Sequence, residues 1–139
     1  MGEIRWEGQK HAEGCGPACL AMLSGMTYED VLAEIATYVG TGHSGNWDTS
    51  GVTHYTLDEF VNRRGYFIQR RYASDEHWIG GWPPKPFAER HYLSVKQPSG
   101  NSHFVVMDSA GRVFDPLQEG VFTLDHWPAV ENIVGLLRA

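Results

Sequence analysis

The sequence predicts an α+β fold in which N-terminal helices pack on a C-terminal antiparallel sheet. Helix caps and apolar residues at helical spacing occupy residues 1–65, whereas alternating apolar residues and short turns fill the remainder. A run of helices followed by a run of strands is typical of the α+β class. A chain of 139 residues has the length of one ordinary domain. We therefore expect one domain over residues 1–139, helical to about residue 65 and a sheet from about residue 66.

Three helices are expected in the first part, over about Gly16–Ser24, Tyr28–Tyr38 and Thr56–Arg64. Gly25 and Gly65 follow the first and third of these, where a left-handed residue commonly ends a helix. Thr27 is a good N-cap for the second helix, and Asp30 three residues later approximates a capping box. The stretch Gly40–Thr53 shows no periodicity and is expected to be a long loop.

The sheet is expected to contain strands over Tyr66–Tyr72, Glu89–Lys96, Ser102–Met107 and Arg112–Asp115, with a further short strand over Val121–Leu124. Asp108 and Gly111 fit a type I turn with a glycine bulge between the third and fourth of these strands. Residues 73–86 contain three prolines and predict a turn-rich connection. The tail Val130–Leu137 is apolar enough to be either a docked helix or a strand.

Composition and charge exclude several classes of partner. The formal charge is −6 and no basic run occurs, which argues against nucleic acid or an anionic membrane as the partner. No apolar stretch is long enough to span a membrane, and the N-terminus lacks the apolar core of a secretory signal. The two cysteines are four residues apart, so a disulfide between them would do little to stabilise the fold. We therefore expect a reduced, cytoplasmic protein with no membrane span, whose oligomeric state the sequence leaves open.

The most informative stretch surrounds Cys15, where a glycine-rich approach turns into an apolar helix. Gly14 and Gly16 flank the cysteine and allow the backbone to come close to a bound group. Pro17 suits the first turn of a helix, where its missing N–H would have no partner. Cys15 should therefore lie at a helix N-terminus, where unpaired N–H groups and the positive end of the dipole favour thiolate over thiol. These features predict a nucleophile.

A base and its orienting group are expected on a β-hairpin. His103 opens one strand and Asp115 closes the next, and the turn between them places both side chains on one face, opposite or diagonal. The carboxylate can then hold the imidazole by its Nδ1–H, which leaves Nε2 free to take a proton from Cys15. Gln9, six residues before the cysteine, can supply an amide N–H to a developing oxyanion beside the backbone N–H of Cys15.

Each of these residues also has an ordinary structural interpretation. A cysteine in a helix is most often an inert small hydrophobe, and a histidine at a strand edge is more often a satisfied polar residue than a base. Asp115 before a proline can be a plain turn former. Cys19 is expected in the core, one turn inward from Cys15. His91 also lies in a predicted strand, but no acidic partner follows it at hairpin distance.

A zinc site is a further alternative. His11, Cys15 and Cys19 are spaced by four residues and could place three ligands on one helix face. No fourth ligand is evident, and Pro17 interrupts the face, so the spacing does not favour zinc. His43 and His54 flank the glycine-rich loop and could line a substrate cleft, although histidines in surface loops are common.

Taken together, the motifs resemble those of the C39 peptidases, papain-like enzymes known from bacteriocin export. Gln9-x5-Cys15-Gly-Pro-Ala-Cys-Leu-Ala-Met is similar to the nucleophile motif of that family, and His103-Phe-Val-Val-Met and Val113-Phe-Asp-Pro116 are similar to its histidine and aspartate motifs. Thr49-Ser-Gly, the helix after it and Gly65 also fit the middle region of the family. The resemblance implies a papain-like fold, with Cys15 as nucleophile, His103 as base, Asp115 as orienting residue and Gln9 as oxyanion donor.

The resemblance implies a cysteine peptidase that acts on a peptide or protein substrate and needs neither metal nor cofactor. Familiar members are joined to a transporter and cut leader peptides after a double glycine; these 139 residues contain no transporter, so the resemblance does not fix the cleavage preference. The bond cleaved is a peptide or an isopeptide bond, and acyl transfer is a related reaction. The alternative is a non-catalytic peptide- or protein-binding module on the same scaffold.

Overall fold

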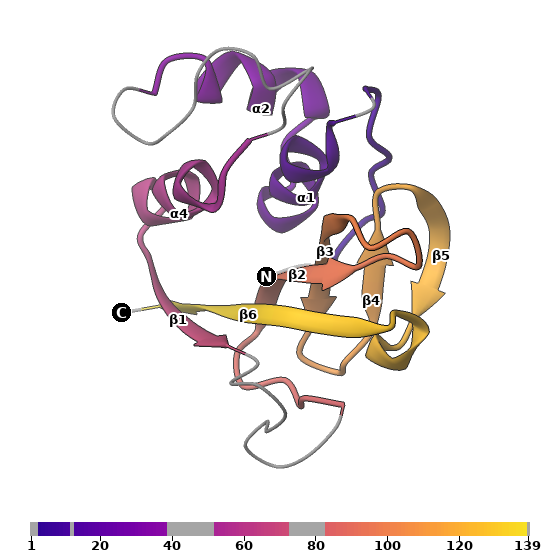
Figure 1. Cartoon of the computed structure of the whole chain (residues 1–139). Coiled ribbons are helices and arrows are strands. Elements are labelled where there is room, and N and C mark those ends of the chain that lie inside the picture. The colour runs from indigo at the N-terminus through magenta and orange to yellow at the C-terminus, as the bar shows by residue number, and fades with distance from the viewer. Residues whose placement is uncertain (1–2, 12, 39–51, 73–82, 139) are drawn as a thin grey trace.

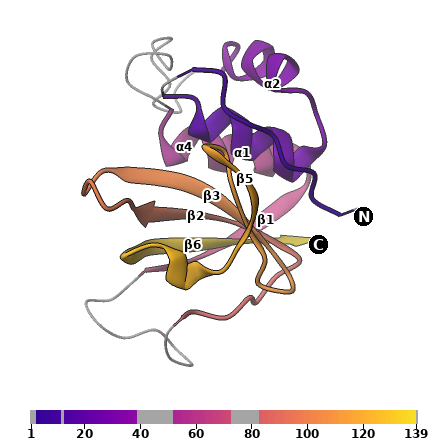
Figure 2. The ribbon, with the colours of Figure 1, turned by 90° about the vertical axis from the view of Figure 1, so that its right-hand side faces the viewer.

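The computed structural model describes residues 3–11, 13–38, 52–72 and 83–138, and within them the fold is α+β, as predicted (Figure 1). The helices lie on one side of a six-stranded antiparallel sheet (Figure 2). The helices are α1 (Cys15–Ser24), α2 (Tyr28–Ile35) and α4 (His54–Arg63), with a 3-10 turn η1 (Leu124–His126). The strands are β1 (Tyr66–Tyr72), β2 (Arg90–Lys96), β3 (Ser102–Asp108), β4 (Val113–Asp115), β5 (Gln118–Phe122) and β6 (Ala129–Arg138).

The predicted helix signals are confirmed where they can be checked. Gly25 takes φ 78°, and its N–H donates to the Ala21 carbonyl, which ends α1. The Thr27 hydroxyl accepts the N–H of Asp30 at 3.1 Å and caps α2. Gly65, with φ 83°, follows α4. The largest differences from the predicted boundaries are that α2 ends at Ile35 rather than Tyr38 and that α4 begins two residues earlier than Thr56.

The strand order is β1-β6-β2-β3-β4-β5. Strands β2 to β5 form the expected meander, and Gly111 takes the left-handed conformation that the turn before β4 requires. The C-terminal tail is a strand, and β6 pairs with both β1 and β2. It takes an inner position because Ile133, Val134 and Leu136 are buried and face both sides of the sheet. Strand β5 begins earlier than predicted, and Leu124 belongs to η1.

Helix α1 is the centre of the helical layer. Its residues from Gly16 to Leu23 are all buried, so the helix is enclosed on every side rather than on one stripe. It packs against α2, α4, β2 and β3. A second apolar cluster on the other face of the sheet is closed by Leu124 and Trp127. Because α1 is fixed on all sides, its first residue is held at a defined place at the edge of the core.

Several predicted features lie outside the described residues: most of the loop Gly40–Thr53 with His43 and Thr49-Ser-Gly, and the part of the 73–86 connection up to Trp82. None of the helices in the described ranges is long and apolar enough to cross a membrane.

Candidate active site

Cys15 is the first residue of α1, as the glycine and proline pattern predicts. It is a free cysteine of intermediate exposure, whereas the helix that follows it is buried. Gly14 precedes it without any side-chain cap, so the first N–H groups of the helix are not closed off by a capping oxygen. The sulfur therefore stands at the accessible end of a rigid helix, beside backbone donors and the positive end of the helix dipole.

The flanking glycines have a different role from the one expected. A Cβ on Gly14 would overlap the hydroxyl of Tyr28, and a Cβ on Gly16 would overlap the Val52 side chain. The close approach that these glycines allow is thus made by the protein's own side chains rather than by an external group. Tyr28 is only 1% exposed, and its hydroxyl also lies 3.1 Å from His11 Nδ1, which ties the approach to α1 onto α2.

His103 and Asp115 are in direct contact across the β3–β4 hairpin. The ladder pairs Val106 with Phe114 and Met107 with Val113, so the same register sets Asp115 opposite Val105, one diagonal step from His103. The ring Nε2–H donates to Asp115 Oδ1 at 2.6 Å, and both side chains are buried. The contact was predicted, but with the wrong ring nitrogen: Asp115 holds Nε2, which leaves Nδ1 for the sulfur. Strand spacing alone does not distinguish the two ring nitrogens.

The electrostatics favour a protonated imidazole at this position. Burial lowers the pKa of His103, but the hydrogen bonds to Asp115 and to Cys15, together with their negative charges, outweigh it and raise that pKa to about 9. Cys15 is therefore a neighbour of the ring and contributes to that shift. An imidazole that is held by a carboxylate and lies beside a thiol is an arrangement that can accept and return a proton.

Gln9 lies in the segment that leads into the site. Its backbone N–H donates to the Pro116 carbonyl at 3.1 Å, which fixes it beside the end of β4. Its side-chain Nε2 donates to the His11 carbonyl at 3.0 Å. The structure thus brings Gln9 next to the residue after Asp115, and a Cβ built on Gly14, the residue before Cys15, would lie 3.3 Å from the Gln9 Cβ.

Trp6 is a site-supporting residue that the sequence analysis did not identify. Its indole Nε1–H donates to the backbone carbonyl of Asp115 at 2.7 Å, across 109 residues of sequence. The Asp115 carboxylate also accepts the N–H of Leu117 at 2.9 Å. The sequence does not reveal this contact, because the partner of the indole is a backbone carbonyl, which every residue has. With Gln9, it attaches residues 3–10 to the strand end that holds the carboxylate.

Cys19 lies in the core, one turn inward from Cys15, as predicted. It is fully buried, and burial raises the pKa of its thiol well above the usual range, so that it stays protonated. The His11 ring contacts Tyr28. In the ranges that the structure describes, no group of three or more His, Cys, Asp or Glu side chains could hold a metal ion.

The other described histidines lie apart from this site. His91 is fully buried in β2, where its Nε2 accepts the N–H groups of Phe87 and Ala88 and its Nδ1–H donates to the Met107 carbonyl. Burial lowers the pKa of His91 to about 4, so it is a neutral structural residue. His54 is exposed at the start of α4, with its ring against Tyr55.

The arrangement as a whole has the parts that thiol acyl transfer needs: an accessible sulfur, a buried imidazole that can donate and accept a proton, a carboxylate that orients it, and N–H groups nearby. Compared with models of protein families and with curated proteins, the chain matches none.

Proposed function

We propose that the protein is a cysteine peptidase that cleaves a peptide or isopeptide bond in a peptide or protein substrate. The observation that carries the proposal is the buried His103–Asp115 pair with Cys15 beside it: the ring donates to the carboxylate at 2.6 Å, and Cys15 acts on the pKa of the same ring. A helical cysteine of purely structural role requires neither a solvent-accessible sulfur nor a buried His–Asp pair beside it. We assign Cys15 as nucleophile, His103 as general acid and base, and Asp115 as the residue that orients the ring.

In the proposed reaction the Cys15 thiolate attacks the carbonyl carbon of the scissile bond and forms a C–S bond. The oxyanion that develops is stabilised by the backbone N–H of Cys15 and, in this proposal, by the side-chain amide of Gln9. Protonated His103 then delivers its Nδ1 proton to the leaving amine as the C–N bond breaks. In the second half, His103 takes a proton from water, the resulting hydroxide attacks the thioester, and the thiolate leaves. The imidazolium–thiolate pair is thereby restored without a metal or cofactor.

The fold that we propose is papain-like, in the manner of the C39 family that the motifs resemble. This fold assignment is supported by where the site residues lie. A central helix carries the nucleophile at its first residue, and an antiparallel sheet carries the base and the orienting residue on adjacent strands. Two free cysteines suit a reducing compartment, and we place the enzyme in the cytoplasm. Cleavage after a Gly-Gly sequence is the first specificity to test.

A thiol-reactive electrophilic peptide probe tests the chemistry directly. Labelling, read by intact mass, should occur once per chain and disappear in Cys15→Ala, and it should slow by at least tenfold in His103→Ala. Cys19→Ala is the matched control, because it removes the second thiol without touching the surface, and it should label at the wild-type rate. An equal labelling rate in His103→Ala and the wild type would contradict the proposal and would indicate that Cys15 is an ordinary surface thiol.

Turnover is tested by incubating the protein with a peptide library and sequencing the new N-termini. Cleavage that is absent in Cys15→Ala identifies the substrate class and its preference on either side of the bond. Saturable binding of library peptides without any cleavage would favour the alternative, a peptide-binding module on this scaffold.

A further inference from the structure

We propose that a second site, a cavity at the C-terminal end of α1, binds a small organic anion: a carboxylate or phosphate carried on an apolar group. The cavity has a volume of about 770 Å³, which is within the range of small-molecule sites. It is bounded by residues 3–10, by the α1–α2 turn and by the ends of α4, β1 and β6. Cys15 begins the same helix, so the two sites are separated by the helix length, about 15 Å for ten residues.

The charge of the cavity is opposite to that of the protein. The chain has 11 basic against 17 acidic residues, with a formal charge of −6. Five of those basic residues and three of the acidic ones line this one cavity, and a fourth carboxylate, Glu34, pairs with Arg64, so the local formal charge is +1 (five minus four). The basic residues are Arg5, Lys10, Arg64, Arg90 and Arg138. A concave region of one sign in a protein of the other sign attracts an anion from solution.

Two of these cations are already neutralised by carboxylates. Lys10 pairs with Glu29, and both guanidinium nitrogens of Arg64 donate to Glu34. Arg138 differs, because its NH2 group donates to the Tyr66 hydroxyl at 2.7 Å and its guanidinium lies 4.6 Å from the centre of that ring. Within the described ranges no carboxylate pairs with either Arg138 or Arg5. These two guanidinium groups are therefore available to hold an anionic head group.

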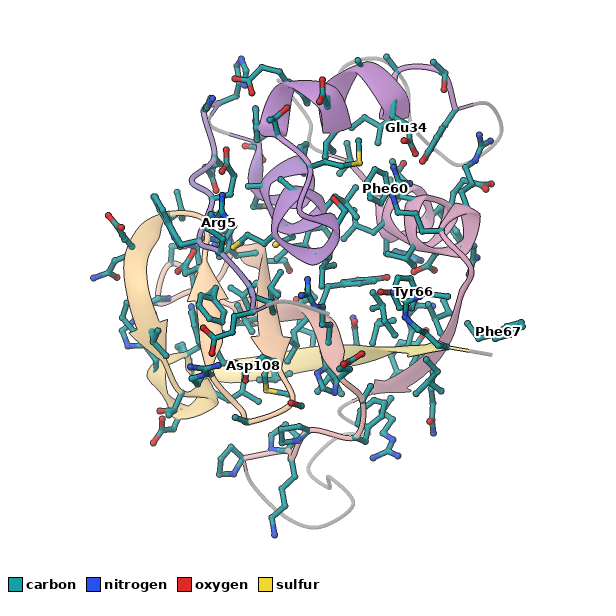
Figure 3. The ribbon with its side chains drawn as sticks, turned by 180° about the vertical axis from the view of Figure 1, so that it is seen from behind. Arg5, Glu34, Phe60, Tyr66, Phe67 and Asp108 are labelled. Atoms are coloured by element: carbon teal, nitrogen blue, oxygen red, sulfur yellow. The ribbon has the colours of Figure 1, made fainter. Side chains whose placement is uncertain are left out.

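Buried apolar side chains line the cavity together with these cations. Leu23, Phe60 and Leu136 are almost fully buried and line the cavity. Arg90, only 7% exposed, donates to the Met22 and Leu23 carbonyls at 3.2 and 2.9 Å and closes the end of α1. Seen from behind, Arg5 lies on one side of α1, and Phe60 and Tyr66 lie on the other (Figure 3). An apolar lining that also carries cations favours a ligand with an apolar body and a charged end over a bare inorganic ion.

The test is a titration of the whole protein with phenyl phosphate, followed by NMR, with benzoate in parallel to distinguish the two head groups. Saturable binding of at least one probe is expected, at least tenfold tighter than binding of inorganic phosphate, and weaker at high salt. The variant Arg5→Gln/Arg138→Gln should weaken it by at least tenfold. The matched control is Arg63→Gln/Lys96→Gln, which removes the same charge outside the cavity and should bind as the wild type does.

No saturable binding of either probe would overturn the proposal, as would equal weakening in the two double variants or equal affinity for inorganic phosphate. Thermal unfolding of each variant shows whether a loss of binding reflects a loss of folding. Because Cys15→Ala protein can be used throughout, the result does not depend on whether Cys15 is a nucleophile.

Discussion

Removing both neighbours of the His103 ring should reverse the direction of its pKa shift. The wild-type pKa of His103 is about 9, although burial alone lowers it. Asp115→Asn removes the charged partner of Nε2, and Cys15→Ala removes the partner on the other side of the ring. Each single substitution should lower the pKa of His103. In the double variant only burial remains, so that pKa should fall below the ordinary histidine value of about 6.5.

The size of the effect follows from the same value. A shift from about 6.5 to about 9 corresponds to about 3 kcal/mol in favour of the imidazolium, at about 1.4 kcal/mol for each pKa unit. The two partners together supply more than that amount, because they also overcome the cost of burial. Since the folded pKa of His103 is raised, this stabilisation is fully present below about pH 6.5 and is lost as the pH rises towards 9. Asp115→Asn should flatten that part of the pH–stability curve.

The assay is an NMR titration of the imidazole signals, assigned by comparison with His103→Ala. Asp125→Asn is the matched control, because it removes an exposed carboxylate near His126 and leaves the site intact. An unchanged pKa of His103 in Asp115→Asn, or a pKa above 6.5 in the double variant, would refute the electrostatic account of the site. In the proposed enzyme, the alkaline limb of the kcat/KM profile should move with that pKa.

Three other outcomes are expected. Trp6→Phe removes the indole N–H that holds Asp115 together with part of a ring that packs against the core, and it should lower kcat several-fold at unchanged KM while costing at least about 1 kcal/mol of stability by urea unfolding. Burial lowers the pKa of His91 to about 4, so the neutral ring contributes its full stabilisation above about pH 6.5. The free energy of unfolding should fall by about 3 kcal/mol as the pH drops from 6.5 to 4, and this part of the pH dependence should be lost in His91→Gln. Gly14→Ala should destabilise the fold by about 1–3 kcal/mol through its clash with the Tyr28 hydroxyl, and adding Tyr28→Phe should recover part of that loss, measured by thermal unfolding.

The parts of the fold that the sequence predicted correctly are those determined by local chemistry. Gly25, Thr27 and Gly111 each act through their own backbone or through a neighbour a few residues away, so the pattern alone locates the helix ends and the hairpin. The diagonal placement of His103 and Asp115 follows from that hairpin, because strand register is fixed once the turn is known.

The parts that could not be predicted depend on contacts between distant segments. The apolar tail Val130–Leu137 fits a helix or a strand equally well, and only pairing with both β1 and β2 makes it an inner strand. The ring nitrogen that meets Asp115 depends on packing around the His103 side chain. The bond from Trp6 to Asp115 joins an irregular segment to a backbone carbonyl, for which no residue pattern exists.

The proposed site residues therefore fall into two groups: those on regular secondary structure and one on an irregular segment that is held by hydrogen bonds. His103, Asp115 and Cys15 are fixed by a sheet and by a helix enclosed on all sides, so substitutions that disturb them also act on the core. Gln9 lies instead on a segment without regular structure, held at the site by the Pro116 carbonyl and, through Trp6, by the Asp115 carbonyl. A loss of those contacts releases the oxyanion donor without exposing much apolar surface. Changes in residues 3–10 should therefore reduce kcat more than they reduce stability, which is the reverse of what core substitutions in α1 should do.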